Sequence, residues 1–427
     1  MSTQQMLAYG ALGFPLAFAA LPLYVHVPRL YAESVGLPLA LVGGVLLLTR
    51  LADALIDPLL GMWSDRLGDR RRLILIALPL LALGLAALLA PPEHGGTAWF
   101  VVTLALTFVG FSLATINYHA WGAELGATPL ERVRVTAARE MFALGGVVVA
   151  AALPSLLSKD VGTAMRHLGW VFVPLLTVAA LATFAGSPLA AVTHRVRPAR
   201  LSAVFHDPRF LRLLVVLAVG GVASAIPATL VLFFIADVLR LHEWQGLFLV
   251  IYVVCGGLAL PGWVALARRH GKVSAWMASM ALAAVSFVWA FLLDAGDGLA
   301  FALICAASGA ALGAELALPP ALLADLLADG RRSGREAAGA GAHFGVWNFV
   351  TKFNLALAAG IALPLVSLGG YKVSASGDPK EVPMGEMTTA EGMLTLAVVY
   401  ALLPAAIKVI SLVLLWRWRP HFEGGRT

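Results

Sequence analysis

Charge is scarce in this sequence. Asp, Glu, Lys and Arg make up 13% of its 427 residues, whereas 60% of the residues are hydrophobic and the mean hydropathy is +0.86. A soluble domain carries about 25% charged residues, so this composition excludes a soluble globular protein and predicts an integral membrane protein. The net charge of +6 comes from basic residues in short segments between apolar runs, so we expect no nucleic-acid partner.

Signatures of enzymes are missing as well. The sequence contains no nucleophile elbow, no cluster of metal ligands and no phosphate-binding loop. Its two cysteines, Cys255 and Cys305, both fall in apolar runs, which argues against a disulfide framework. We therefore expect neither an enzyme nor a bound cofactor.

Long apolar runs are abundant. Twelve of them have the roughly 20 residues that cross a bilayer. They lie near residues 7–31, 37–63, 73–91, 98–123, 138–157, 168–191, 210–238, 244–266, 273–293, 298–327, 337–366 and 393–416. This pattern predicts an all-α membrane protein with 12 transmembrane helices in two six-helix halves. The halves are residues 1–193 and 209–427, and a basic central loop at 194–208 joins them.

Basic residues are unevenly distributed among the connecting loops. The even-numbered loops and the central loop contain fifteen of them: Arg66, Arg70, Arg71, Arg72, Arg132, Arg134, Arg195, Arg197, Arg200, Arg268, Arg269, Lys272, Arg331, Arg332 and Arg335. The odd-numbered loops contain six: Arg29, Lys159, Arg166, Arg240, Lys372 and Lys380. Because Lys and Arg accumulate on the cytoplasmic side, we expect the even-numbered loops, the central loop and both termini to be cytoplasmic. The expected location is the inner (plasma) membrane of a bacterium, and the expected state is a monomer.

The two halves resemble each other at one place. GMWSDRLGDRRR (61–72) follows the second apolar run, and ARRHGK (267–272) follows the eighth. A short turn with Gly and a basic cluster thus recurs in both halves. Two six-helix halves with such a repeat are typical of transporters that work by alternating access.

These motifs are similar to those of a known superfamily. The pattern GxxxDRxGxRR at 61–71 resembles the loop 2/3 signature of the major facilitator superfamily, which implies a gating role for Gly61, Asp65, Arg66 and Arg70. RLADALIDP (50–58) resembles the second-helix motif of the glycoside–pentoside–hexuronide:cation symporter family. Three further segments resemble the same family: TINYHAWG (115–122), LLADLLADG (322–330) and WNFVTKFNLALAAG (347–360).

Asp53 and Asp57 stand four residues apart, so they share one face of a helix. A carboxylate in the middle of a membrane span is costly, and it normally faces a cavity and has a partner. One reading is a structural pair of Asp53 with Arg50, which leaves the second carboxylate unexplained. The other reading is a cation site, in which two carboxylates share a proton or bind a metal ion through oxygen.

The coupling ion is H⁺ or Na⁺. The resemblance places Ile56 where sodium-using relatives have an asparagine, which favours a proton. Sodium at Asp53 and Asp57 would need further oxygen ligands, and Thr115 and Asn117 could supply some of them. Lys352 lies mid-span, too deep to reach a membrane surface, and we expect it to pair with one of the two aspartates across the cavity.

The predicted substrate site lies on three helices. Asn117 and Trp121 are one turn apart, which suits hydrogen bonds to a sugar and stacking on its ring, although aromatics at a helix end would look the same. The resemblance adds Arg139, with a salt bridge to Glu140 or to the loop as the alternative, and Asn348. Glu315 is also mid-span, and a satisfied structural carboxylate and a second proton site remain open for it.

Three functions can be compared with these observations, and the buried charges argue against the third. The first is cation-coupled symport of a glycoside or similar small solute by alternating access. The second is a carrier of a lipid or another amphiphile, because the sugar-binding acidic residues of galactoside-using relatives are replaced by Ala17 and Asn117. The third is a membrane sensor or scaffold, which would have no need for buried charges such as Asp53, Asp57 and Lys352.

Overall fold

The computed structural model describes residues 1–31, 35–92, 96–158, 160–188, 201–333, 338–371 and 390–423. All the regular elements in these ranges are helices, and they are α1 (Thr3–Ala11), α2 (Gly13–Arg29), α3 (Leu39–Leu67), α4 (Arg70–Leu89), α5 (Thr97–Leu125), α6 (Pro129–Leu157), α7 (Val161–Gly186), α8 (Pro208–Phe233), α9 (Gln245–His270), α10 (Lys272–Ala290), α11 (Gly298–Arg332), α12 (Ala340–Leu368), α13 (Ala390–Ala397) and α14 (Leu403–Glu423). Short 3₁₀ or π segments complete them: η2 (Leu201–His206), η3 (Phe234–Val238), η4 (His242–Trp244) and η5 (Val398–Leu402).

The helices confirm the predicted class. In the described residues, eleven helical stretches are long and apolar enough to cross a membrane. Helix α3 has 29 residues and is the twelfth long helix, set apart by the charges of Arg50, Asp53 and Asp57 in its middle. The structure is thus an all-α membrane protein with twelve long helical stretches.

Several basic residues expected in loops lie on helix ends instead. Arg70 begins α4, Arg132 lies in the first turn of α6, and Arg331 lies in the last turn of α11. The apolar runs mark only the hydrocarbon-crossing part of each helix, and the polar turns beyond it continue the same hydrogen-bond ladder. The basic residues are therefore held by rigid backbone rather than by flexible loops.

Contacts divide the chain into two compact units. The first comprises Met1–Phe210 and Leu316–Phe349, and the second comprises Leu211–Glu315 and Val350–Thr427. The last part of α11 and the first part of α12 therefore belong to the first unit. The predicted boundaries at residues 193 and 209 stay a prediction, and residues 189–200 of that connection lie outside the described ranges.

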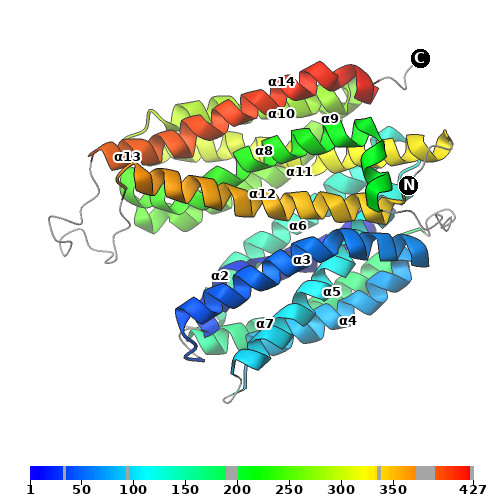
Figure 1. The fold of residues 1–427 in the computed structure, drawn as a ribbon, viewed down its shortest axis with the longest axis horizontal. Coiled ribbons are helices and arrows are strands. Elements are labelled where there is room, and N and C mark those ends of the chain that lie inside the picture. Colours follow the sequence, from blue (N-terminus) through cyan, green and yellow to red (C-terminus); the bar gives the residue numbers. More distant parts are fainter. Residues whose placement is uncertain are drawn as a thin grey trace. The chain divides into compact units, whose positions relative to one another are not determined.

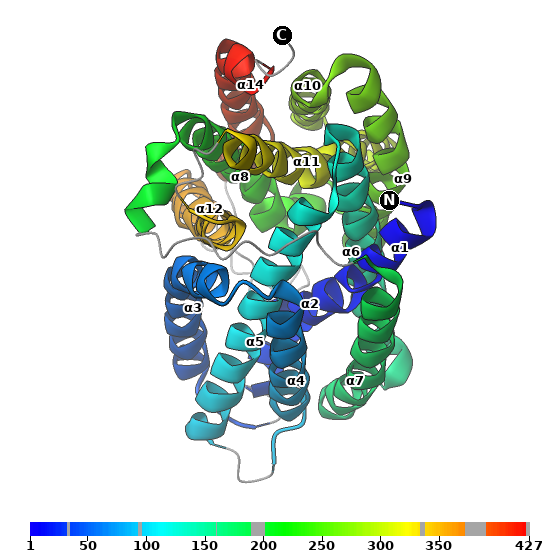
Figure 2. The same ribbon diagram turned by 90° about the vertical axis from the view of Figure 1, so that its right-hand side faces the viewer.

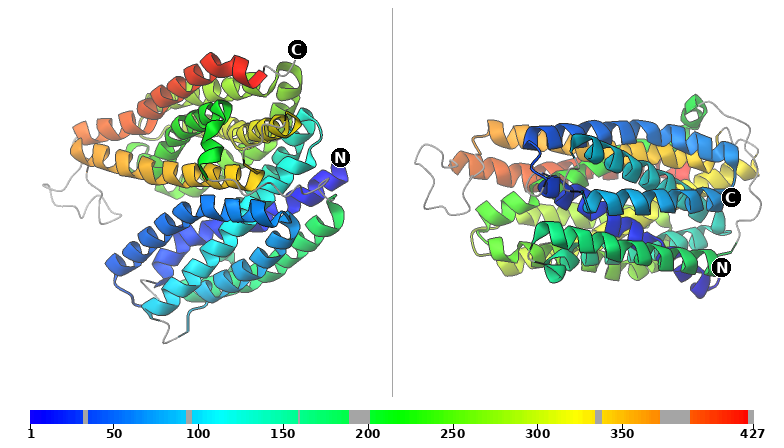
Figure 3. Two further views of the ribbon diagram at one scale, coloured as in Figure 1. Left: turned by 45° about the vertical axis from the view of Figure 1, so that its right-hand side comes forward. Right: turned by 90° about the horizontal axis from the view of Figure 1, so that it is seen from below.

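Helices α4 and α5 lie side by side in the first unit (Figures 1 and 2). Small residues permit this approach, because a Cβ at Gly84 would lie 2.7 Å from the Thr107 nitrogen. In the second unit, α10 lies beside α14, drawn in red (Figures 2 and 3). There the π-helical turns η3 and η5 meet through Phe234 and Tyr400, whose stacked rings have centroids 4.1 Å apart.

A tight turn connects α3 to α4. Gly68 ends α3 with φ of 72°, a left-handed conformation that glycine adopts without strain. Asp69 then caps α4 by accepting a hydrogen bond from the Arg72 nitrogen at 3.0 Å. With only these two residues between the helices, Arg70 is turned back toward the end of α3.

Candidate cation site and gate network

The two aspartates of α3 are buried. Asp57 is fully inaccessible and Asp53 is 8% exposed. Both lie more than two turns from either end of α3. Pro58 follows directly, and because proline has no N–H, the Ala54 carbonyl receives no helical hydrogen bond from that position. This stretch of α3 therefore combines two carboxylates with a backbone oxygen that lacks its usual helical donor.

Helix α5 supplies hydroxyl groups to this stretch. Ser112 donates a hydrogen bond to the Asp53 carboxylate at 2.7 Å. Thr115, three residues further, lies on the same side of α5 and donates to the Phe111 carbonyl at 2.9 Å. A hydroxyl that donates within its own helix keeps oxygen lone pairs for another donor or a cation. The structure thus joins Asp53 to α5 through Ser112, a residue that the sequence interpretation missed.

The predicted residues of α12 share one helix face. Gly341, Gly345, Asn348 and Lys352 follow one another at intervals of four, three and four residues, so they form one stripe along the helix. A Cβ at Gly345 would lie 2.5 Å from the Asp57 carbonyl oxygen, so this stripe faces α3 where the two helices meet in the first unit. Lys352 belongs to the second unit, and its pairing with Asp53 or Asp57 stays a prediction.

The Asp65 carboxylate caps the start of α12. One oxygen accepts a hydrogen bond from the Gly341 nitrogen, the other accepts one from the Ala342 nitrogen, and both distances are 2.8 Å. Arg70 donates to the same carboxylate at 2.5 Å, and both side chains are less than a tenth exposed. The free N–H groups and the dipole at a helix N-terminus favour a negative charge. Asp65 thereby ties the end of α3 to the start of α12.

Arg70 extends this network to α5. It donates to the Ser64 hydroxyl, which in turn donates to the side-chain oxygen of Asn117. The amide nitrogen of Asn117 donates to the Leu113 carbonyl at 2.8 Å. Asn117, predicted to bind substrate, is fully buried here and has its amide engaged on both sides.

Glycines bring α3 and α12 into backbone contact. A Cβ at Gly61 would lie 2.1 Å from the Gly341 carbonyl oxygen, a distance that real Cβ atoms do not reach. Only glycine at position 61 therefore allows this packing without a shift of one helix. The predicted gate residues Gly61, Asp65 and Arg70 come together at this crossing, whereas Arg66 lies exposed in the last turn of α3.

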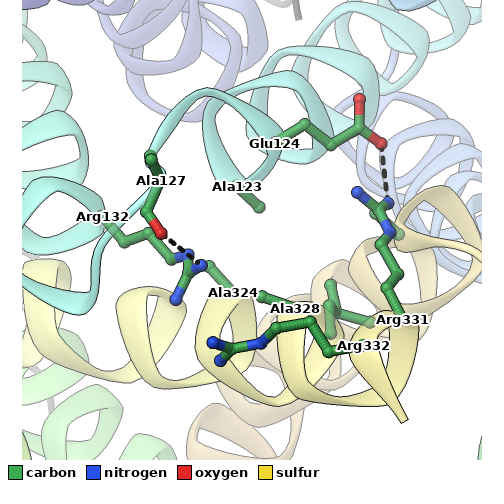
Figure 4. Close-up of a pocket in the computed structure, with 11 residues that line it drawn as sticks. Ala123, Glu124, Ala127, Arg132, Ala324, Ala328, Arg331 and Arg332 are labelled. Atoms are coloured by element: carbon green, nitrogen blue, oxygen red, sulfur yellow. Dashed lines mark hydrogen bonds and ion pairs between the residues drawn. The ribbon is translucent and has the colours of Figure 1, made fainter. Parts of the chain in front are cut away.

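Further ion pairs surround the network. Glu124 of α5 accepts from Arg331 at 3.0 Å and from Arg70 at 3.5 Å, and Arg132 of α6 donates to Asp325 at 2.7 Å. Glu124, Arg132 and Arg331 border a cavity of about 230 Å³ between the end of α5, the start of α6 and the last turns of α11, shown in Figure 4. The end of α11 is thus held to α5 and α6 by two arginines on opposite sides of the cavity.

Comparison with known proteins identifies the family. Residues 6–419 match the family described as MFS/sugar transport protein, where MFS denotes the major facilitator superfamily. The chain belongs to this family. The predicted superfamily is therefore confirmed.

Curated relatives of this chain are named as symporters. The uncharacterized symporter sll1374 of Synechocystis is 30% identical over 196 residues, which are 41% of this chain and 35% of that protein. The inner membrane symporter YicJ of Escherichia coli is 27% identical over 150 residues, which are 33% of this chain and 32% of that protein. The matched segments thus span about a third of each relative.

Solved structures support the fold of the chain. The Escherichia coli fucose:proton symporter FucP has a TM-score of 0.68 and 13% identity, over 97% of this chain and 98% of that one. A bacterial homologue of the iron transporter ferroportin in the outward-facing state has a TM-score of 0.69 and 16% identity, over 98% of this chain and all of that one. At such low identity these matches establish the major facilitator fold alone.

Trp121 lies in an aromatic core. Its ring is fully buried and stacks on Phe184 at 5.9 Å between centroids, with the edge of Tyr9 at 5.5 Å. The guanidinium carbon of Arg71 lies 5.5 Å from the centroid of the Trp121 ring. Trp121 is therefore packed between α1, α4 and α7 in this conformation, and its predicted contact with substrate stays a prediction.

The other predicted substrate residues are spread out. Arg139 is 4% exposed and forms an ion pair with Glu140 at 2.6 Å, as one of its two readings expected. Asn348 is half-buried on the stripe of α12 described above. Among the predicted site residues, the structure thus brings together the gate residues and connects Asn117 to them, while Trp121 and Arg139 have other partners.

Proposed function

We propose that this transporter is a cation-coupled symporter, driven by protons in preference to sodium, that carries a sugar or a similar small polar solute. The observation that carries the proposal is the buried pair Asp53 and Asp57 in the middle of α3, with the Ser112 hydroxyl on Asp53. Carboxylates at such depth bind a cation or a proton in membrane proteins. The sugar rests on the family description, which names sugar transport.

The gate network supplies the conformational part of the cycle. Asp65 and Arg70 join the end of α3 to the first turn of α12 within the first unit. For alternating access, these contacts must break when the transporter opens at that end. We propose that this end is cytoplasmic, because Lys and Arg accumulate there, and that the protein is a monomer with both termini in the cytoplasm.

A second candidate is a carrier of an amphiphile such as a lysolipid. By resemblance, Ala17 of α2 stands where galactoside-using relatives have an acidic residue, and Pro15 and Pro22 accompany it on a helix with few polar side chains. A solute with few hydroxyl groups would need fewer polar partners. Transport measurements with sugars and with a lysolipid distinguish the two candidates.

The test uses the purified protein in proteoliposomes. Radiolabelled xylose, methyl galactoside, glucuronate and a lysophospholipid are offered under an imposed inward gradient of either H⁺ or Na⁺. We expect accumulation of one of the sugars under the H⁺ gradient. Asp57→Asn is expected to lower accumulation strongly and to retain exchange of solute across the membrane, because neutralising the carboxylate removes coupling through α3 and leaves the path intact.

Asp69→Asn serves as the matched control. Asp69 is an exposed carboxylate outside the span, in the turn between α3 and α4, and should leave accumulation unchanged. Undiminished accumulation by the Asp57→Asn variant would refute the coupling role, and transport of the lysophospholipid alone would favour the amphiphile carrier. Accumulation that follows Na⁺ and ignores H⁺ would reassign the ion.

A further inference from the structure

A second buried ion pair lies in the middle of the second unit. Lys408 of α14 contacts both oxygens of the Glu315 carboxylate of α11, at 2.8 and 2.9 Å. The side chain of Lys408 is 4% exposed and that of Glu315 is 15% exposed. Each residue stands near the centre of its candidate span, Glu391–Phe422 for Lys408 and Gly298–Arg332 for Glu315. The sequence interpretation left Glu315 without a partner and missed Lys408.

Helix α8 completes the site. The Lys408 ammonium also donates to the Ser224 hydroxyl at 2.7 Å and lies 3.1 Å from the Gly220 carbonyl oxygen. Ser224 in turn donates to the Glu315 carboxylate at 2.9 Å. The ammonium thus has four oxygen neighbours for its three hydrogens, and the cluster is satisfied while Glu315 remains charged.

Small residues of α8 allow α12 and α14 to pack closely against it. A Cβ at Gly220 would lie 2.9 Å from the hydroxyl of Ser411 on α14, and a Cβ at Gly221 would lie 2.0 Å from the amide of Asn354 on α12. Asn354 itself donates to the Leu217 carbonyl at 3.2 Å. The cluster is therefore a built polar site on the faces of α8, α11, α12 and α14, at a depth where charge is costly.

Among the described residues, further ionisable groups lie around the Glu315–Lys408 pair. Tyr252 of α9 lies within electrostatic range of Glu315, and Cys305 of α11 and Tyr400 of η5 lie within range of Tyr252. From α8 the pair is contacted by the neutral side chain of Ser224, while Asn354 of α12 donates to the Leu217 carbonyl of α8. Lys352 is two residues before Asn354, about 200° around the helix, so it does not share the face of Asn354. The charge of Glu315 is thus balanced by Lys408.

We propose that Glu315 is a second proton-binding site of the transport cycle. Its ion pair with Lys408 breaks when the proton binds and forms again when the proton leaves. This inference rests on the proposed proton-coupled symport. A proton from the aqueous phase binds a Glu315 carboxylate oxygen, forming an O–H bond, and the carboxyl then no longer holds the Lys408 ammonium as a counter-ion. Lys408 keeps its own protons and its contacts with Gly220 and Ser224.

Proton binding at this site is linked to helix position. An ammonium without a counter-ion is strongly disfavoured in a dry site, so Glu315 gains a proton stably only when α11 and α14 part from α8 and admit water. Conversely, when the cluster is closed, the Lys408 ammonium is the counter-ion of the Glu315 carboxylate. A proton taken up on one side of the membrane would therefore be released when the cluster closes.

A purely structural ion pair is the competing explanation, and a neutral replacement separates the two. The double variant Glu315→Gln with Lys408→Met keeps the volume of the cluster and removes both charges together, which folded proteins tolerate better than the loss of one partner. Glu315→Asp keeps a titratable carboxylate and serves as the conservative control. The structural explanation predicts that only stability changes, whereas a proton site predicts a change in proton binding.

The primary test needs no substrate. Infrared difference spectra of the protein in lipid, recorded between about pH 9 and pH 5, report the conversion of carboxylates to carboxyl groups. We expect a carboxyl band that the neutral double variant lacks and that Glu315→Asp retains in shifted form. Identical spectra for the wild-type protein and the neutral double variant would overturn the proposal. The Asp57→Asn protein, measured in parallel, reports the α3 site separately.

Sugar accumulation then distinguishes the two proton sites. For one pH unit of gradient, two coupled protons support up to about 100-fold accumulation and one proton about 10-fold, because each contributes a factor of ten. We expect the neutral double variant to accumulate about tenfold less than wild type, with exchange retained. If the neutral double variant loses accumulation and Asp57→Asn does not, the α3 site is refuted and the Glu315 site is supported. The reverse result, or no response of the wild type to a pH gradient, would overturn this inference.

Discussion

The Asp65 carboxylate holds the start of α12 to the end of α3, and its removal should weaken this contact. Its carboxylate accepts two backbone hydrogen bonds at the start of α12 and one from Arg70, and it is 7% exposed. Asp65→Ala removes all three at once. The Gly341 and Ala342 nitrogens lose their acceptors, and the buried Arg70 guanidinium loses its closest counter-ion.

The size of the effect follows from these contacts. Removing one partner of a buried ion pair costs about 3–5 kcal/mol, and the loss of a helix N-cap costs about 0.5–2 kcal/mol. The two costs are not additive, because the same carboxylate is both the ion-pair partner of Arg70 and the cap of α12. In addition, Glu124 at 3.5 Å from Arg70 remains as a weaker partner. We therefore take the lower end, about 3 kcal/mol, as the loss of free energy of the α3–α12 contact. This corresponds to a factor on the order of 10² in its population.

Amide hydrogen exchange measures this loss. The Gly341 and Ala342 amides should exchange on the order of 10² faster in Asp65→Ala than in the wild type, because local opening exposes them. Asp65→Asn keeps one acceptor oxygen and loses the charge, so an intermediate rate is expected. Asp69→Ala is the matched control, since Asp69 caps α4 in the same way. Unchanged protection of the α12 amides in Asp65→Ala would refute the capping role.

Three further predictions test the neighbouring elements. Gly61→Val should weaken the α3–α12 contact by about 1–3 kcal/mol through overpacking, seen as a lower melting temperature, while an unaltered melting temperature would mean that the helices can part freely. Trp121→Ala should cost about 3–5 kcal/mol of stability by emptying the aromatic core, and a loss of sugar affinity with unchanged stability would restore its predicted substrate role. Lys352→Ala should destabilise the protein more than the double change with Asp53→Ala or with Asp57→Ala, as measured by double-mutant cycles on thermal stability, and additive losses in both cycles would exclude the predicted pairing.

Some site residues could be found from the pattern of charge alone. Asp53, Asp57 and Glu315 stand out because a carboxylate inside an apolar run is costly and normally has a partner or a function. Lys408 carries the same signal, a lysine in the middle of the last apolar run, and should have been read in the same way. Ser112 carries no such signal, because a serine in an apolar helix commonly bonds its own backbone.

Partners remote in sequence could not be foreseen. Asn117 and Trp121 are one turn apart, and this spacing predicted a shared ligand. In the structure Asn117 is turned to Ser64 of α3, while Trp121 stacks on Phe184 of α7. The spacing on one helix says which residues are neighbours along it, but the packing of other helices decides what each of them meets.

The sequence by itself determined the class of protein, the twelve long helices and the depth of the charged residues in the membrane. These properties follow from the length and polarity of each segment and from the high cost of charge in hydrocarbon. Only the tertiary structure decided that Asp65 caps a helix 276 residues away and that Lys408 reaches Glu315 across 93 residues. Such pairings depend on which helices pack together and on where glycines let their backbones touch, and no local pattern encodes either of these.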